Sequence, residues 1–318
     1  MSETPNILVA TYSEGLFLLG ASGVSRELEG ESIFALSSDG AGGALAIVGG
    51  SSVRRRSPAG RWTTLAEGQI GLSSCAALGK QIFVGTSNAR VLRVQADGTF
   101  APLPAFETVE GRETWYAGNT VIDGRVVGPP LGVRSMCGSC DGSTLLVNVH
   151  VGGVPRSTDS GQTWKPTIEV ASDVHQVTAH PDRPEVAAAA TALGLALSTD
   201  GGKSWKIDHK GLHATHCLAV AFVGDEVWVS ASPDPFSDGV VYRRSIDGSR
   251  PLQSLSGRVL PQQFERGVDT GNIAAKGDVV AIADRAGHLY VSRDRGTKWE
   301  LLSMVPGPSG VLVLPGGS

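Results

Sequence analysis

Four of the seven histidines stand in loops beside short β-rich runs, where their side chains could carry out chemistry. His150 follows such a run, His175 and His216 precede one, and His213 lies in the same loop as His216. A neutral imidazole can act as a general acid or base, and it is also a common metal ligand. The sequence therefore predicts catalytic roles for His150, His175 and His216, and a substrate contact for His213.

Other polar residues in similar loops extend this set. The planar guanidinium of Arg134 can bind a carboxylate through two parallel hydrogen bonds, although a salt bridge to Asp269 or Glu31 is the alternative. Asp269 is predicted as a catalytic acid or base. Tyr12 and Asp234 are predicted as substrate contacts. For both aspartates the alternative role is to cap a turn.

No cofactor or metal motif is evident. His213 and His216 are three residues apart in an irregular segment, which is not the spacing of a helical zinc motif. No metal ligand is therefore assigned, and an ion held by the imidazoles stays an alternative.

Composition limits the broad class of protein. The 318 residues are 41% hydrophobic with a formal net charge of −4, which predicts a sizeable core and no basic surface for nucleic acid. No apolar run is long enough for a membrane span, and residues 1–5 do not begin a secretory signal. Four cysteines form no disulfide framework in a chain of this length. We expect a cytoplasmic protein without nucleic-acid or membrane partners.

One octapeptide recurs along the chain. Residues 157–164, 198–205 and 292–299 share a Ser-x-Asp-x-Gly core and end in Trp, and residues 245–252 are an eroded copy. The Asp carboxylate can accept backbone N–H bonds and close a turn, and the Gly can adopt a positive φ. The Trp can fill the space between neighbouring sheets. The octapeptide therefore predicts a structural turn.

The spacing of these repeats predicts a β-propeller. Trp164 and Trp205 are 41 residues apart, and a period near 40–45 residues built from short strands is typical of that fold. Inner strands are predicted at residues 33–36, 73–77, 133–137, 176–179, 217–222 and 273–275. The last apolar run, residues 311–314, would complete a seventh blade with residues 7–10 and 16–19. We therefore expect an all-β, seven-bladed propeller of four-stranded antiparallel blades, forming one domain over residues 1–318.

Strand direction gathers the polar candidates at one end of the ring. Neighbouring strands are antiparallel, so the loops leading into the inner strands and those leaving the second strands share one end, which we call the mouth. All the candidates above fall there. Residues 102–130 form a long insertion beside the mouth and are predicted to be a lid or pocket wall. Its Trp115 is predicted to stack on a substrate.

The octapeptide resembles the Asp-box, or BNR repeat, of bacterial sialidase-like propellers. The resemblance covers nearly the whole chain through its blades, and it implies the propeller fold. The active-site residues of true sialidases are not matched. The Arg-Ile-Pro signature is missing from residues 10–14, only Arg134 and Arg285 are placed to bind a carboxylate, and only Tyr12 and Tyr116 could serve as the tyrosine nucleophile.

Three functions remain open. The first is a hydrolase or lyase of the sialidase-like superfamily that acts on, or a protein that binds, a small polar or anionic molecule such as a sugar derivative. The second is a non-catalytic propeller that binds a protein or acts as an assembly factor. The third is a propeller with a histidine-bound metal ion.

Overall fold

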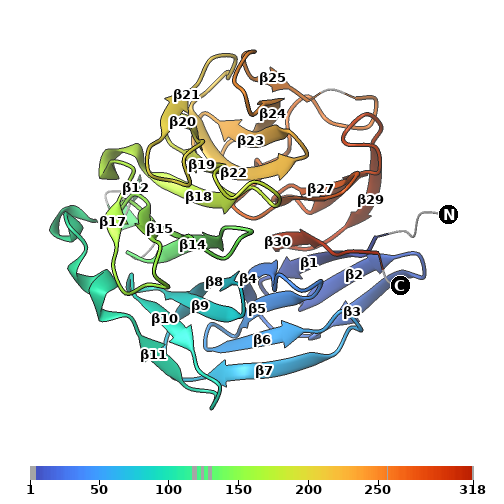
Figure 1. The fold of residues 1–318 in the computed structure, drawn as a ribbon. Helices are drawn as coiled ribbons and strands as arrows, with labels where there is room; N and C mark the ends of the chain where they lie inside the picture. Colours follow the sequence, from blue (N-terminus) through green and yellow to red (C-terminus); the bar gives the residue numbers. More distant parts are fainter. Residues whose placement is uncertain (1–4, 117–119, 123–124, 128–130, 256, 317–318) are drawn as a thin grey trace.

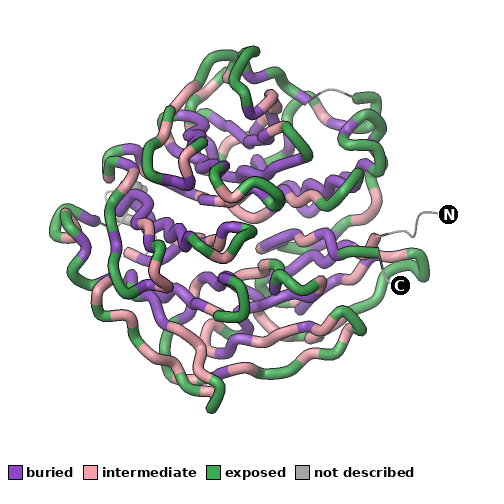
Figure 2. Tube along the Cα trace, in the orientation of Figure 1, coloured by how far each residue is buried: buried purple, intermediate pink, exposed green. Residues whose placement is uncertain are grey.

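A computed structural model describes residues 5–116, 120–122, 125–127, 131–255 and 257–316. These residues form seven four-stranded antiparallel blades arranged in a ring, a seven-bladed β-propeller, as predicted (Figure 1). Within each blade the inner strand lines the axis and the remaining strands follow outward. The second strands are buried along nearly their whole length, whereas the inner strands mix buried residues with partly exposed ones, and exposed residues concentrate in the turns and outer strands (Figure 2).

The first four blades contain these strands, each blade listed from the axis outward. Blade 1 contains β30 (Pro308–Val313), β1 (Ile7–Thr11), β2 (Leu16–Gly20) and β3 (Gly23–Glu27). Blade 2 contains β4 (Ile33–Ser38), β5 (Ala44–Val48), β6 (Ser52–Arg56) and β7 (Trp62–Glu67). Blade 3 contains β8 (Leu72–Leu78), β9 (Gln81–Thr86), β10 (Val91–Val94) and β11 (Phe100–Pro102). Blade 4 contains β14 (Val133–Gly138), β15 (Leu145–Val149), β16 (Pro155–Ser157) and β17 (Lys165–Pro166).

The last three blades continue the same order. Blade 5 contains β18 (Val174–Ala179), β19 (Ala187–Thr191), β20 (Gly194–Ser198) and β21 (Lys206–Asp208). Blade 6 contains β22 (His216–Val223), β23 (Glu226–Ser232), β24 (Val240–Ser245) and β25 (Gln253–Ser254). Blade 7 contains β26 (Ile273–Lys276), β27 (Val279–Ala283), β28 (His288–Ser292) and β29 (Glu300–Met304).

The ring closes by pairing its two ends. β30 pairs antiparallel with β1, with Ile7 opposite Val313 and Val9 opposite Val311. The strand drawn in red near the C-terminus therefore lies beside the blue N-terminal strands (Figure 1). This pairing removes two free sheet edges from the propeller. The predicted closure and the seven predicted inner strands are confirmed, with ends shifted by a few residues.

The insertion between blades 3 and 4 is only partly described. It begins with two short 3₁₀ helices, η1 (Pro104–Thr108) and η2 (Arg112–Thr114), and contains a hairpin of β12 (Thr120–Ile122) and β13 (Arg125–Val127). Residues 117–119, 123–124 and 128–130 of the predicted lid lie outside the described residues. A third 3₁₀ helix, η3 (Val170–Ser172), precedes β18. No helix in the described ranges is long and apolar enough to cross a membrane.

The octapeptide forms the predicted turn between the third and fourth strands. In blade 5, Asp200 accepts hydrogen bonds from the backbone N–H groups of Lys203 and Ser204, both at 3.0 Å. The Ser198 hydroxyl donates to Asp200 and accepts from the Gly202 N–H at 2.8 Å. Blades 4 and 7 repeat this arrangement around Asp159 and Asp294. We call the end of the ring that carries these turns the turn face.

Candidate functional site

Irregular pairing at the mouth end of the inner strands brings several candidates toward the axis. The register between first and second strands shifts between Val133 and Ser135 in blade 4 and between Val174 and Gln176 in blade 5. The residue inside each shift is Arg134 or His175. A β-bulge bends a strand and redirects a side chain, and such bulges are common beside active sites. The same position in blade 2 holds Phe34.

Three imidazoles from three consecutive blades lie together at the mouth. His150 follows β15 in blade 4, His175 is the second residue of β18 in blade 5, and His216 begins β22 in blade 6. The ring centroids of His150 and His175 are 5.8 Å apart, and those of His175 and His216 are 4.5 Å apart. The structure thus brings together all three histidines that the sequence predicted as catalytic.

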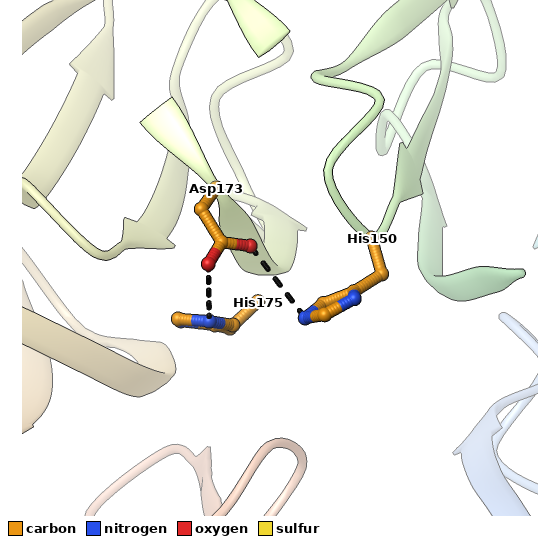
Figure 3. A group of neighbouring side chains, drawn as sticks. All are labelled: His150, Asp173 and His175. Carbon is orange, nitrogen blue, oxygen red and sulfur yellow. Dashed lines mark ion pairs between the residues drawn. The ribbon is translucent and has the colours of Figure 1, made fainter. Parts of the chain in front are cut away.

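Asp173 lies between two of these imidazoles (Figure 3). One carboxylate oxygen, Oδ1, is 3.5 Å from His150 Nε2, and the other, Oδ2, is 3.6 Å from His175 Nε2. Asp173 adopts the left-handed conformation, with φ 46° and ψ 79°, where the 3₁₀ helix η3 ends. Non-glycine residues with such dihedral angles are uncommon and concentrate at functional sites.

Burial keeps two of the histidines neutral at pH 7. Desolvation, followed by the positive charge of Arg134, lowers the pKa of His150 to about 4. Desolvation, followed by the neighbouring His175, lowers the pKa of His216 to about 4 as well. Burial acts to raise the pKa of Asp173, but its neighbours His175, His150 and Arg134 outweigh that effect and the pKa is lowered. The cluster therefore combines an ionised carboxylate with neutral imidazoles that can accept a proton.

A second cluster lies beside the histidines and contains two guanidinium groups. Asp269 Oδ1 is 3.4 Å from Arg134 Nη2, and Asp269 Oδ2 is 2.8 Å from Arg285 Nη2. Burial acts to raise the pKa of Asp269, whereas Arg134 and Arg285 lower it by more, so the carboxyl group is ionised. An ionised Asp269 held by two arginines cannot donate a proton readily. This geometry favours a positioning role for Asp269 over the predicted acid–base role.

Tyr12 stands at the edge of the second cluster. Its side chain is more than half exposed and lies edge-on to Phe34, with ring centroids 6.2 Å apart. Desolvation of the hydroxyl and then the charge of Asp269 raise the pKa of Tyr12, so it remains protonated and can donate a hydrogen bond. Tyr12 therefore lies where the sequence placed it, at the mouth.

One or two residues of each cluster line a channel along the propeller axis. The cavity has a volume of about 990 Å³ and is lined by inner strands of several blades. Tyr12, Arg134, His150 and Asp269 line its mouth end, whereas His180 and Lys276 line it near the turn face. A cavity of this size can hold a small molecule together with water.

Three predicted substrate contacts are engaged in other interactions, although the charge of one of them, Asp234, also acts on His216. Trp115 is 8% exposed and belongs to the hydrophobic core between blades 3 and 4, where Arg112 covers its ring at 4.7 Å. The predicted stacking of Trp115 on a substrate stays a prediction, and this arrangement leaves little of the ring free for it, because protein already covers the ring. His213 is exposed and bonds through Nδ1 to the Tyr242 hydroxyl at 2.8 Å, away from the histidine cluster. Asp234 is exposed and caps a turn by accepting from the N–H groups of Phe236 and Ser237.

The sequence reasoning missed Asp173 as a site residue. A usable signal was present, because Asp173 and His175 are two residues apart at the start of a strand, and such residues share one face. The reasoning also missed Gln176, whose side-chain oxygen accepts from the Val220 and Gly271 N–H groups. Gln176 thereby ties the inner strands of blades 5 and 6 to the loop that leads into blade 7.

Comparisons with known proteins support the fold. No family model and no curated protein matches the chain. Among solved structures, the chain is similar to a GH74 enzyme from Niastella koreensis, with a TM-score of 0.58, 13% identity and coverage of 94% of this chain and 46% of that one. The chain thus spans about half the length of that enzyme.

Two further solved structures match over nearly their whole length. One is a putative 6-phosphogluconolactonase from Bacteroides uniformis, with a TM-score of 0.62, 15% identity and coverage of 98% of this chain and 100% of that one. The other is YCF48 bound to D1 peptide, with a TM-score of 0.55, 14% identity and coverage of 100% and 95%. At these identities the likeness establishes the propeller fold alone.

Proposed function

We propose that the mouth binds a small anionic molecule, such as an acidic sugar derivative, and that the protein is a hydrolase or lyase of the sialidase-like Asp-box propellers. The observation that carries this proposal is the convergence of His150, His175 and His216, from three blades, beside the guanidinium of Arg134. Of these groups, Arg134 and His150 line a cavity large enough for a small molecule. Polar side chains are costly to bury without partners, so such a concentration favours a ligand site.

The proposed chemistry divides the roles among these side chains. Arg134 would hold an anionic group of the ligand, because its ion pair with Asp269 engages only Nη2 and leaves its other N–H groups to donate. A neutral His150 or His216 would take a proton from the ligand or from an attacking water. The Tyr12 hydroxyl would donate a hydrogen bond to a neutral oxygen of the same ligand.

Binding of sugar acids, sugar phosphates and lactones, measured by calorimetry, tests this proposal. Arg134→Lys keeps the charge but loses the two-pronged donor, so we expect the affinity for the best ligand to fall at least about tenfold. The matched control is Arg55→Lys, because Arg55 also pairs with an aspartate, Asp39, at 2.8 Å but at the turn face. Equal affinities for the two variants would contradict the proposal.

A second candidate function is the binding of a protein partner at the mouth. Of ten large apolar side chains exposed in the described residues, eight belong to segments at the mouth end of the blades. These eight are Tyr12, Phe34, Ile70, Tyr116, Leu193, Phe236, Val259 and Met304. Exposed apolar side chains that share one end of a protein favour an interaction site there, and the similar propeller YCF48 was solved with a bound peptide.

Changing the apolar side chains separates the two candidates. A partner on this surface should be lost from the double variant Phe236→Ser, Leu193→Ser and retained by Val24→Ser, which changes an exposed residue at the turn face. Binding of a small molecule at the mouth should be unchanged by all three substitutions.

We also propose a cytoplasmic location, because Cys75, Cys137, Cys140 and Cys217 are free thiols. Cell fractionation tests this location.

A further inference from the structure

We propose that His150, Asp173 and His175 hold a divalent transition-metal ion, such as Zn²⁺, at the mouth. Each residue offers one ligand atom, and the three atoms lie within 4.8 Å of one another (Figure 3). Donors bound at about 2.1 Å around a tetrahedral zinc ion are about 3.4 Å apart. Asp173 Oδ1 is 3.5 Å from His150 Nε2 and Asp173 Oδ2 is 3.6 Å from His175 Nε2, so each imidazole nitrogen has a carboxylate oxygen at close to that separation. Two imidazoles and one carboxylate are also a donor set typical of such ions.

The hydrogen bond of His175 fixes which nitrogen faces Asp173. His175 Nδ1 is 2.6 Å from the carbonyl oxygen of Cys217, and a carbonyl oxygen can only accept, so Nδ1 carries a proton. In the neutral ring Nε2 then presents a lone pair toward a carboxylate oxygen 3.6 Å away. Two electron-rich atoms facing each other repel, and a cation between them removes the repulsion. Metal-bound histidines commonly donate their other N–H to a carbonyl in this way.

Unpartnered polar atoms around the same point support the inference. Within the described residues, Asp173 Oδ1, His150 Nδ1 and His216 Nδ1 are buried and have no hydrogen-bond partner. The His150 side chain is more than nine-tenths buried, and its Nε2 points toward Asp173 (Figure 3). Buried polar atoms are usually satisfied. An ion on Asp173 and on His150 Nε2 would satisfy the carboxylate, and it would leave Nδ1–H of His150 to a water molecule.

The site also has room for a further ligand. Asp173 keeps 31% of its side chain exposed, and His150 lines the axial cavity, so the point between them can be reached from the channel. The charges of Asp173 and Asp269 balance those of Arg134 and Arg285. A divalent ion would add two positive charges and attract an anion to the open coordination position. This inference deepens the ligand site proposed above and leaves the proton-accepting role there to His216, because His150 would be a metal ligand. Its test needs no substrate.

Calorimetric titration of the chelator-treated full chain with ZnCl₂ tests the inference. We expect one ion per chain, confirmed by elemental analysis, and an affinity at least about 100-fold lower in Asp173→Asn, because loss of even an outer-shell partner costs 10–100-fold. Asparagine tolerates the left-handed conformation of residue 173, so this variant should fold. His150→Gln is a second ligand variant. His209→Ala, which changes an exposed histidine, is the control and should bind as the unchanged protein does.

Cobalt gives an independent readout of the same ligands. Co²⁺ bound by two imidazoles and a carboxylate should give visible absorption bands that both ligand variants lose and His209→Ala keeps. Absence of stoichiometric binding, or equal affinity in the unchanged protein and Asp173→Asn, would overturn the inference. If the chelator-treated protein still bound an anion in an Arg134-dependent way, the proposed function would stand while the metal site fell. If the protein bound Zn²⁺ in an Asp173-dependent way but bound no anion, the metal site would stand while the proposed function fell.

Discussion

The two ends of the ring use aspartate in different ways. At the turn face, Asp200 accepts hydrogen bonds from two backbone N–H groups and from the hydroxyls of Ser198 and Ser204. At the mouth, Asp173 is half-buried, and one of its oxygens is buried with no hydrogen-bond partner among the described residues. Both carboxyl groups have lowered pKa values and are ionised at neutral pH.

These two aspartates have different roles, since one stabilises the fold and the other is available to a ligand. The carboxylate of Asp200 is satisfied by its own octapeptide, so it stabilises a turn and leaves nothing for a ligand. The carboxylate of Asp173 is surrounded by side chains from blades 4 and 5 that do not complete its hydrogen bonds. A group that a protein buries without full satisfaction is a better indicator of a site than one of high charge alone. Variants at the two ends should therefore change different properties.

The largest effect on stability is expected from a tryptophan of the octapeptide. Trp164 is 9% exposed, packs edge-on to Phe106 with centroids 4.9 Å apart, and donates from Nε1 to the Gly161 carbonyl at 3.0 Å. Trp164→Ala should lower the free energy of unfolding by about 3–5 kcal/mol through the cavity it leaves. Urea unfolding measures the change. If the folded variant lost metal or anion binding, the division between a turn face that stabilises the fold and a mouth that binds ligands would be contradicted.

A smaller loss of stability is expected when an octapeptide carboxylate is removed. Asp200→Ala deletes the acceptor for the Lys203 and Ser204 N–H groups. Water can replace part of this interaction, so the free energy of unfolding should fall by about 1–2 kcal/mol. Binding of ligands at the mouth should not change. Urea unfolding measures the loss of stability, and calorimetry on the same preparation measures ligand binding. A change in ligand binding would contradict the prediction.

A still smaller effect on stability is expected from Asp173→Asn. Burial opposes the charge of Asp173 while His175, His150 and Arg134 favour it, so the two effects offset each other. The free energy of unfolding of the metal-free protein should change by less than about 1 kcal/mol, in the usual range of substitutions outside packed cores. A loss as large as that of Trp164→Ala would show that Asp173 is a structural residue.

The smallest effect concerns the stability of the turn face in acid. Burial acts to raise the pKa of Asp200, and hydrogen bonds from Ser204, Ser198 and Lys203 outweigh it and lower the pKa from 3.8 to about 2. Because the folded-state pKa is depressed, this contribution is fully present above 3.8 and is lost as the pH falls through about 2. The stability difference between the unchanged protein and Asp200→Asn should therefore shrink over that range. A difference that stays constant would argue against the assigned hydrogen bonds.

Much of the fold could be predicted because its signals are local. The octapeptide turns depend on residues within eight positions of one another, and the inner strands are short apolar runs between turn residues. The closure of the ring followed from incomplete blades at the two ends of the chain. The gathering of His150, His175 and His216 followed in turn from strand direction, once the inner strands were assigned.

The features that the sequence did not predict depend on contacts between residues far apart in the chain. Trp115 is buried partly because Gly152 has no side chain, since a Cβ at that position would lie 3.0 Å from the Trp115 ring. His213 is held by Tyr242, 29 residues away. The ion pair of Arg134 with Asp269 was an alternative that the sequence offered, and the structure contains it, whereas the pairing of Asp269 with Arg285 was not predicted. No spacing rule links Trp115 to Gly152, His213 to Tyr242 or Asp269 to Arg285, so these contacts could not be predicted from the sequence.

Thermal unfolding with and without Zn²⁺ tests the central contrast most directly, when the unchanged protein is compared with Asp173→Asn and Asp200→Asn. At a free ion concentration about 100 times the dissociation constant, binding adds about 2.7 kcal/mol of stability, or roughly 4 °C for a chain of this length. We predict that shift for the unchanged protein and for Asp200→Asn, and none for Asp173→Asn. Equal shifts in all three proteins, or a shift lost only in Asp200→Asn, would contradict the account.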